Sequence, residues 1–348
     1  MTILCLCMGL ALSTHAAELN TQRLITDSSG RIVTVPGNIK RIACLYAFTG
    51  HAVTLLGRGD DIVAVARGLL RDSLLLEICP AIKKARVPKS QGGINIEELL
   101  KSKPDIVFLS GDVGHNPGET DKLNAFHLPY LVVDYDTMDG QKKAVTMIGD
   151  ALGEEKRAKA YVDYFDQCIG KVQHTIRKLP ENKRLRIYHS VNEANRTAIP
   201  NSISTQWLDA LGVINVAAGN IGTLSGDKYR VGMEQIMVWN PDVIFTNEPS
   251  VQSMIRSDSR WAPLAAVRSN KVFLLPIAIS RWGHPGSVET PLALLWAAGT
   301  LYPEQFKEVD IAGETRIFYQ NFFDYRLSEK QVRMILEGRL KRKPKMKH

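Results

Sequence analysis

Arginine, histidine and aromatic residues follow several predicted strands of this 348-residue chain, whereas pairs of acidic residues are scarce there. Ligands of open α/β sheets bind outside the carboxyl ends of the strands, so residues at these positions are candidates for ligand contact. Guanidinium groups recognise carboxylate, catecholate and oxyanion groups, and aromatic rings add flat contact area. The sequence therefore predicts a site for an anion or an anionic chelate, with these candidates: Tyr46, Arg67, Tyr188, His189, Arg196, Arg281, Trp282 and His284.

Each candidate also has a structural alternative. Arg67 could extend from a strand end into solvent, His189 could be a hydrogen-bonded core histidine, and Trp282 could serve packing alone. These alternatives stay open on the sequence. His284 precedes Pro285 in a stiff loop, which favours a ligand contact for this histidine.

Motifs for catalysis or for a resident cofactor are absent from the sequence. It contains no GxGxxG, GxxxxGK[ST], HExxH or GxSxG pattern. His189, Glu193 and His284 are candidate ligands for a bare metal ion, but the nearby arginines would repel one. We therefore expect no catalytic residue and no cofactor, and a metal already wrapped by an acidic chelator, most simply Fe³⁺, fits better than one held by side chains alone.

Composition excludes several classes of protein. With 45% hydrophobic and 23% charged residues, the chain can bury a core, and its length suits two domains. The net charge is +8, but Lys and Arg within 339–348 supply six of these charges. This local tail removes the main support for a nucleic-acid partner. Of Cys44, Cys79 and Cys168, Cys44 and Cys168 are expected to pack, and a single Cys44–Cys79 disulfide remains open.

Predicted strands alternate with helices in two successive series. The first series of strands covers 41–48, 61–67, 105–111 and 129–136, and the second covers 185–191, 242–247 and 271–277. Helices are expected over 96–101 and 204–211, and an amphipathic helix covers 154–179. This pattern predicts two open α/β sheets joined by one long helix. The expected domains are a lobe over 18–153, the connecting helix over 154–179, a lobe over 180–338 and a basic tail over 339–348.

An internal repeat supports the duplication. Glu97 precedes Pro104-Asp105 and an apolar run by the same spacing with which Glu234 precedes Pro241-Asp242. In each copy the proline ends a helix and the apolar residues enter a strand. Each glutamate falls in the first helical turn, where compensation of the helix dipole is the structural alternative to a functional role.

The N-terminus resembles a secretory signal. Residues 3–12 are apolar and are followed by small residues, so we expect cleavage after Ala16 or Ala17 and a signal peptide over 1–17. A buried N-terminal helix or strand is the alternative. Export predicts a soluble periplasmic protein, and we expect it to be a monomer.

Taken together, these features resemble the class III periplasmic substrate-binding proteins of ABC importers for iron–siderophores, haem and cobalamin. The resemblance rests on residues 93–97 with 104–107, the second copy around Glu234, and the segments 207–212, 282–285 and 318–323. It implies two Rossmann-like lobes, a rigid connecting helix and a ligand cleft between the lobes. It further implies that Glu97 and Glu234 dock onto arginines of the permease dimer in the inner membrane.

The resulting hypothesis is a periplasmic receptor that captures an anionic metal chelate, foremost a ferric siderophore, and delivers it to an ABC transporter. The same receptor could instead carry molybdate, tungstate, cobalamin, haem or a nickel chelate. An enzyme on a nitrogenase-like or dinucleotide-binding scaffold is an alternative of another class. A third alternative is a binder of nucleic acid or a membrane surface that acts through the basic tail.

Overall fold

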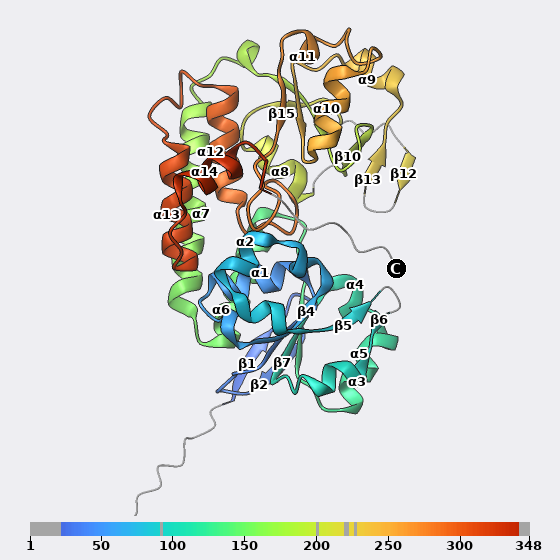
Figure 1. Cartoon of the computed structure of the whole chain (residues 1–348), viewed down its shortest axis with the longest axis vertical. Helices are drawn as coiled ribbons and strands as arrows, with labels where there is room; N and C mark the ends of the chain where they lie inside the picture. Colours follow the sequence, from blue (N-terminus) through green and yellow to red (C-terminus); the bar gives the residue numbers. More distant parts are fainter. Residues whose placement is uncertain (1–21, 91–92, 200–201, 219–222, 226–227, 341–348) are drawn as a thin grey trace, which may run out of the picture.

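The computed structural model describes residues 22–90, 93–199, 202–218, 223–225 and 228–340. The predicted signal peptide and residues 341–348 of the basic tail lie outside the described residues. Two α/β lobes are stacked along the long axis of the molecule, and helix α7 runs along one side of both (Figure 1). This arrangement is the predicted fold class.

The sheet of the first lobe has the strand order β6-β5-β4-β3-β7-β8 and is parallel except for β6. Its strands are rich in Val, Ile and Leu because helices cover both faces. One face packs on α1 and α6, and the other on α3, α4 and α5. The bounds of these elements are β3 Ile42–Cys44, β4 Ile62–Ala66, β5 Arg86–Ser90, β6 Gly93–Ile94, β7 Ile106–Ser110, β8 Tyr130–Val133, α1 Ala47–Leu55, α3 Ile96–Lys101, α4 Gly111–Gly114, α5 Pro117–Ala125 and α6 Met138–Leu152.

The second lobe repeats the plan with a parallel sheet in the order β11-β9-β14-β15. A small antiparallel sheet, β10-β13-β12, lies beside it and was not predicted from the sequence. The bounds are β9 Arg186–Ser190, β10 Arg196–Ala198, β11 Ile214–Asn215, β12 Thr223–Ser225, β13 Lys228–Arg230, β14 Val243–Thr246, β15 Val272–Leu274, α8 Ile203–Asp209, α9 Met233–Trp239, α10 Pro249–Ser257 and α11 Ala265–Arg268.

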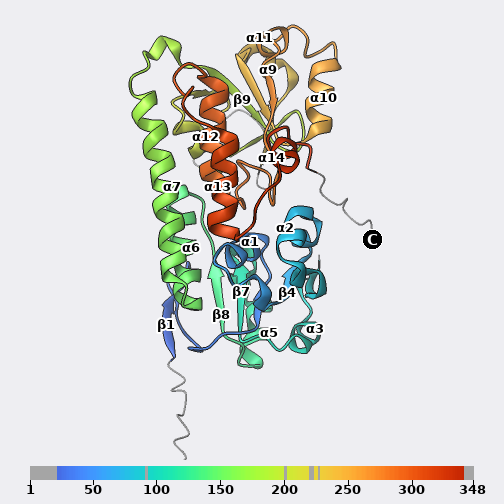
Figure 2. The ribbon, with the colours of Figure 1, turned by 60° about the vertical axis from the view of Figure 1, so that its left-hand side comes forward.

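Helix α7 (Glu155–Ile176) is the predicted connecting helix, and its 22 residues span about 33 Å at 1.5 Å per residue. Its buried face is the one that the apolar spacing predicts, from Ala158 through Phe165 to Ile176. Figure 2 shows α12 (Thr290–Leu301) and α13 (Ile311–Phe323) lying along it. The connecting helix is therefore one member of a helical layer that backs both lobes.

The C-terminal helices provide a second link between the lobes. At one end of α7, Arg157 donates to the carbonyl of Phe322 at 3.2 Å and to Asp324 Oδ2 at 3.1 Å. After α13, Tyr325 donates to Glu77 of α2 (Ser73–Ile78), and Gln331 of α14 (Glu329–Leu336) donates to the same carboxylate at 3.2 Å. These contacts tie the first lobe to a segment far away in sequence and restrict hinge motion.

The internal repeat reappears as matching contacts. Asp105 Oδ2 accepts a hydrogen bond from Arg41 N at 2.9 Å, and Asp242 Oδ2 accepts one from Arg186 N at 2.8 Å. Each arginine also donates to a carbonyl at the end of the helix that precedes its aspartate. Arg41 donates to Ser102 at 2.7 Å, and Arg186 donates to Trp239 at 2.8 Å. Both copies thus use the same arginine–aspartate pair to fix a helix end to a strand start.

Several local expectations differ from the structure. The strand predicted over 41–48 ends at Cys44, because Tyr46 is the N-cap of helix α1 and Phe48 belongs to that helix. Cys44, Cys79 and Cys168 are free and buried, so a Cys44–Cys79 disulfide is not formed. Burial raises the pKa of the Cys44 thiol to about 12, which makes it a packing residue. Over the described part of the chain, no helix is long and apolar enough to cross a membrane.

Candidate ligand site between the lobes

The carboxyl edges of the two parallel sheets meet. Tyr135, just after β8 of the first lobe, donates a hydrogen bond to the carbonyl of Pro285 at 2.9 Å. Pro285 belongs to the segment 275–289 between β15 and α12, which we call the 275–289 loop. Gln141 Nε2 of α6 donates to the carbonyl of Ser287 at 3.0 Å, and the backbone N of Met138 donates to Gln206 of α8 at 2.9 Å. The strand ends of both lobes therefore border one region, as the sequence predicts.

The 275–289 loop carries Arg281, Trp282 and His284 and is anchored from several sides. Tyr161 of α7 donates to the carbonyl of Val288 at 2.9 Å. The fully buried Glu289 accepts hydrogen bonds from Ser280 N at 2.9 Å and from Tyr319 Oη of α13 at 2.6 Å. Burial raises the pKa of the Glu289 carboxyl above its usual range. Because both lobes and two helices hold this loop, its side chains keep defined positions at the lobe boundary.

Arg281 lies where three strand ends of the second lobe come together. Its Nη1 donates to Asn192 Oδ1, just after β9, at 2.8 Å. The same nitrogen forms an ion pair with Glu248, which follows β14. The backbone N of Asn192 donates to Asn247 Oδ1 at 2.8 Å, so the three residues after β9 and β14 form one polar cluster around the guanidinium. Sequence reasoning placed Arg281 at this edge but missed Glu248 and Asn247.

Arg67 and Tyr46 occupy the corresponding edge of the first lobe. Arg67 opens a short 3₁₀ turn (Arg67–Arg71) directly after β4, and its half-buried side chain makes no hydrogen bond or ion pair with another described residue. Tyr46 follows β3 at the start of α1 and is also half-buried. Burial raises the pKa of the Tyr46 phenol, so the hydroxyl stays protonated at neutral pH and can donate. This edge therefore presents Arg67 and Tyr46, together with Lys89 of β5, which donates to Ser110 Oγ at 3.5 Å.

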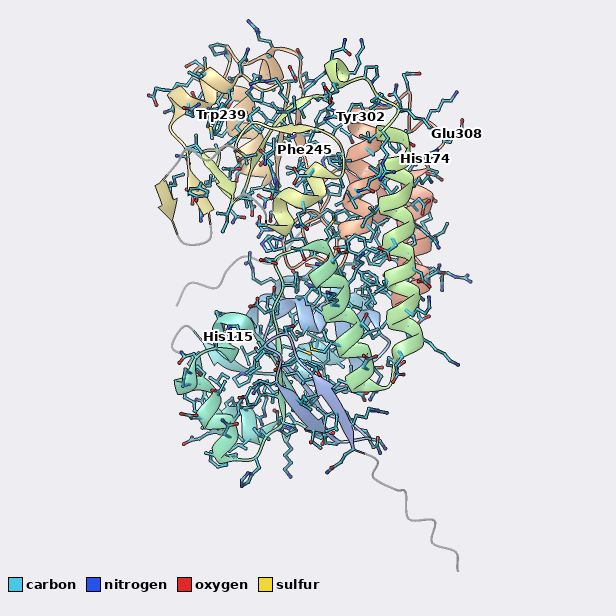
Figure 3. The ribbon with its side chains drawn as sticks, turned by 180° about the vertical axis from the view of Figure 1, so that it is seen from behind. His115, His174, Trp239, Phe245, Tyr302 and Glu308 are labelled. Atoms are coloured by element: carbon cyan, nitrogen blue, oxygen red, sulfur yellow. The ribbon has the colours of Figure 1, made fainter. Side chains whose placement is uncertain are left out.

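Tyr188 and Trp282 are both fully buried. Tyr188 has 0% exposure, donates to the carbonyl of Ala194 at 3.0 Å and packs against Trp239, which Figure 3 shows inside the second lobe. Its ring belongs to the smaller core cluster of the second lobe, which also contains Ile236 and Ile244. Trp282 is also fully buried in the main core. Both side chains thus have a packing role, and contact between either of them and cargo stays a prediction.

The two candidate histidines occupy different settings. His189 is buried beside the ring of Trp207, with 5.7 Å between the ring centroids. His284 is half-buried in the 275–289 loop, and its Nδ1 accepts a hydrogen bond from Gly286 N at 3.2 Å. Contact between either histidine and cargo stays a prediction.

Arg196 lies in the small side sheet and not at an end of the main sheet. It pairs with Glu193 at 2.9 Å, and Glu193 also pairs with Arg230 at 2.8 Å. Among residues with described placement, no group of three or more His, Cys, Asp or Glu could hold a metal ion. Two further histidines, His115 and His174, lie in different parts of the molecule (Figure 3).

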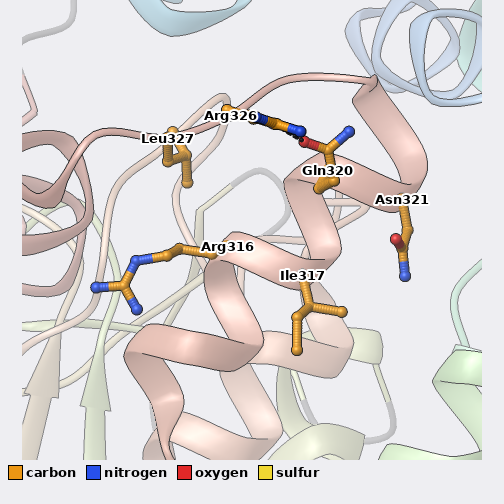
Figure 4. A pocket seen from close by; sticks show the side chains of 6 residues that line it. All are labelled: Arg316, Ile317, Gln320, Asn321, Arg326 and Leu327. Carbon is orange, nitrogen blue, oxygen red and sulfur yellow. Dashed lines mark hydrogen bonds between the residues drawn. The ribbon is translucent and has the colours of Figure 1, made fainter.

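An open pocket elsewhere contains none of the predicted ligand residues. It lies on the outer face of α13 and the turn that follows (Figure 4). Two of its polar groups already have partners, since Arg316 bonds both oxygens of Glu329 at 2.7 Å and Arg326 donates to Gln320 at 3.2 Å. The lining residues are Arg316, Ile317, Gln320, Asn321, Arg326 and Leu327.

Comparison with known proteins decides the family. Residues 42–278 match the family model described as periplasmic binding protein. The chain belongs to this family. It is thus a binding protein, a solute receptor of an ABC importer as the resemblance implies, and the enzyme alternatives are set aside.

Two relatives of this periplasmic binding protein illustrate the family. The chain is 27% identical to the molybdate-binding protein MolA of Haemophilus influenzae over 92% of this chain and 95% of the relative. The structure of MolA bound to molybdate has a TM-score of 0.78 at 25% identity and covers 88% of this chain and 99% of that one. A vitamin B12-binding protein of Vibrio cholerae is 25% identical over 69% of this chain and 82% of the relative.

Glu97 and Glu234 are exposed on the two lobes of this binding protein. They occupy the first turns of α3 and α9, the two helices of the internal repeat. Figure 1 shows both helices on the side of the molecule away from α7. Neither carboxylate forms an ion pair with another residue whose position is described, although Glu98 beside Glu97 pairs with Arg86. Both glutamates are therefore accessible to a partner.

Proposed function

We propose that this periplasmic binding protein captures a small oxyanion of the molybdate or tungstate type and delivers it to an ABC permease. The observation that carries the proposal is the meeting of two strand edges that bear Arg67 and Arg281 on opposite lobes. Guanidinium groups donate paired hydrogen bonds to oxyanions, and these charge-assisted bonds are about twice as strong as neutral ones. The similarity to MolA over nearly the whole chain supports this cargo class.

A ferric chelate, which is the leading cargo of the sequence hypothesis, is the second candidate here. Tyr46 at the edge of the first lobe favours it, because a half-buried phenol offers flat contact area to a planar catecholate ligand. Export to the periplasm is part of this proposal and can be checked by fractionating cells that produce the full chain.

Titration of the purified full chain tests the cargo. Molybdate, tungstate, sulfate, a ferric catecholate complex and cyanocobalamin are added separately while heat release is followed by calorimetry. We expect molybdate or tungstate to bind with a Kd below about 10 μM and sulfate to bind more weakly. Binding of the ferric complex alone would select the second candidate. If none of these compounds binds below that concentration, the anion-receptor proposal is refuted.

The role of Arg67 can be tested in the same assay. Arg67→Gln should weaken oxyanion binding about tenfold or more, because it removes a charge-assisted hydrogen-bond donor. Arg260→Gln is the matched control, since Arg260 is exposed and, among the described residues, pairs with Asp258. Equal affinities of the Arg67→Gln variant and the native chain would remove Arg67 from the site.

We also propose that Glu97 and Glu234 contact the permease. The two carboxylates lie on equivalent helices of the two lobes, which suits a partner made of two similar subunits. Glu97→Gln together with Glu234→Gln should abolish cargo uptake by the reconstituted importer while leaving the Kd for the cargo unchanged. Glu329→Gln, on the helical layer, serves as the control. Unchanged uptake by the double variant would contradict the docking role.

A further inference from the structure

The Arg281–Glu248 ion pair sits at the lobe boundary, where the cargo is proposed to bind. We propose that Glu248 is a built-in competing anion, which holds Arg281 in the empty receptor and is displaced when an oxyanion binds. Glu248 would then lower the affinity of the receptor for anionic cargo. This inference rests on the proposed function and names a residue that controls it.

The geometry makes Glu248 the partner that can leave. Its side chain is 37% exposed, whereas that of Arg281 is 16% exposed. The carboxylate is thus the partner that can rotate into water, whereas the less exposed guanidinium cannot leave the loop. The guanidinium, held in the loop between the lobes, remains where the cargo would meet it.

A neutral support keeps Arg281 in place without Glu248. Arg281 Nη1 also donates to Asn192 Oδ1 at 2.8 Å. Asn192 has a positive φ of 66° and is braced by Asn247, which accepts from its backbone N at 2.8 Å. Asparagine tolerates this left-handed backbone better than most residues do. Loss of the carboxylate therefore leaves the guanidinium oriented, and Glu248 acts on the charge of Arg281 more than on its position.

The two lobes differ in this respect. Arg67 of the first lobe forms no ion pair within the described ranges, so its charge is available to an incoming anion from the start. Arg281 of the second lobe becomes available only when an anion competes with Glu248. An oxyanion would meet Arg67 first and recruit Arg281 afterwards, with Glu248 opposing the second step.

The test measures molybdate and tungstate binding to Glu248→Gln by calorimetry, beside the native chain. Glutamine keeps the shape of the side chain and removes its charge. We expect the variant to bind the oxyanions about tenfold more tightly, because a competing ion pair and a like-charge repulsion are both removed. Glu98→Gln is the matched control, since Glu98 forms a comparable pair with Arg86 at 31% exposure. Glu248→Ala provides a second variant if glutamine perturbs folding.

The Arg281→Gln background separates competition from a general charge effect. There Glu248→Gln should raise affinity by clearly less than tenfold, because no guanidinium remains to be released and only the like-charge repulsion is removed. Equal or weaker binding by Glu248→Gln, or the same gain in both backgrounds, would overturn the inference while the proposed function stands. If the native chain binds no oxyanion but Glu248→Gln does, the inference stands and the cargo proposal fails for the native chain. If neither binds, both fail.

Discussion

Replacement of Glu289 by alanine is expected to destabilise the protein and weaken its cargo site together. Glu289 has 0% exposure and accepts hydrogen bonds from Ser280 N, Ser280 Oγ and Tyr319 Oη at 2.9, 2.7 and 2.6 Å. Alanine would leave Ser280 N and Tyr319 Oη without this acceptor, whereas Ser280 Oγ keeps its bond to Ser287. At about 1–3 kcal/mol for each buried donor left without its partner, we expect a loss of about 2–6 kcal/mol.

Urea unfolding at neutral pH gives the stability change, and calorimetry gives the oxyanion affinity of the same preparations. Tyr319→Phe should cost less, about 1–2 kcal/mol, because it removes a single hydroxyl. The double variant should lose at least about 1 kcal/mol less than the sum of the single variants, since both remove the same hydrogen bond. Strict additivity, or a loss below about 1 kcal/mol for Glu289→Ala, would refute the claim that this network anchors the 275–289 loop.

Two further predictions follow from local structure. Burial raises the pKa of Glu289 above the value near 4.5 that it keeps in the unfolded chain, so the folded protein binds this proton more tightly. The free energy of unfolding of the native chain, relative to that of Glu289→Gln, should therefore be greatest below about pH 4.5 and fall as pH rises through the raised pKa. Urea titrations measure this difference, and a difference that stays constant from pH 4 to 8 would contradict the prediction. Lys103 and Asn240 occupy equivalent left-handed positions before Pro104 and Pro241, with φ of 44° and 39°. Lys103→Gly should stabilise the protein by about 0.5–1 kcal/mol. Asn240→Gly should not stabilise it, because asparagine already tolerates that conformation and its Oδ1 accepts a hydrogen bond from Ala265 N at 2.8 Å. Thermal unfolding that ranks the two variants the other way would speak against this.

The helical layer and the tail bear on the remaining alternatives. Hydrogen bonds to Glu77 from Tyr325, which follows α13, and from Gln331 of α14 join the lobes a second time, so cargo binding is expected to move the lobes little. The described residues end at Leu340, and the neighbouring Arg339 pairs with Glu337 at 3.1 Å. Because the family match spans residues 42–278 and does not reach the tail, a role of the tail in binding nucleic acid or membrane surfaces remains a separate hypothesis.

Local patterns in the sequence were enough to predict the connecting helix and the repeat. The spacing from Ala158 to Ile176 already specified which face of α7 is buried, because a helix repeats every 3.6 residues whatever it packs against. The Pro-Asp signatures at 104–105 and 241–242 likewise marked helix ends and strand starts, since their effects depend on neighbouring backbone groups. Arg67 and Arg281 could be placed at strand ends for the same reason.

Tertiary packing decided what those strand-end residues do. Tyr188 faces Trp239 and not the other lobe, because the strand's register in the sheet determines which side each residue takes. Glu248 and Asn192 reach Arg281 from 33 and 89 residues away, and no local pattern encodes a contact between such distant segments. The sequence by itself thus determined two lobes and a set of cationic residues at strand ends. Only the folded chain decided which of these cations has an ion-pair partner and which groups face the other lobe.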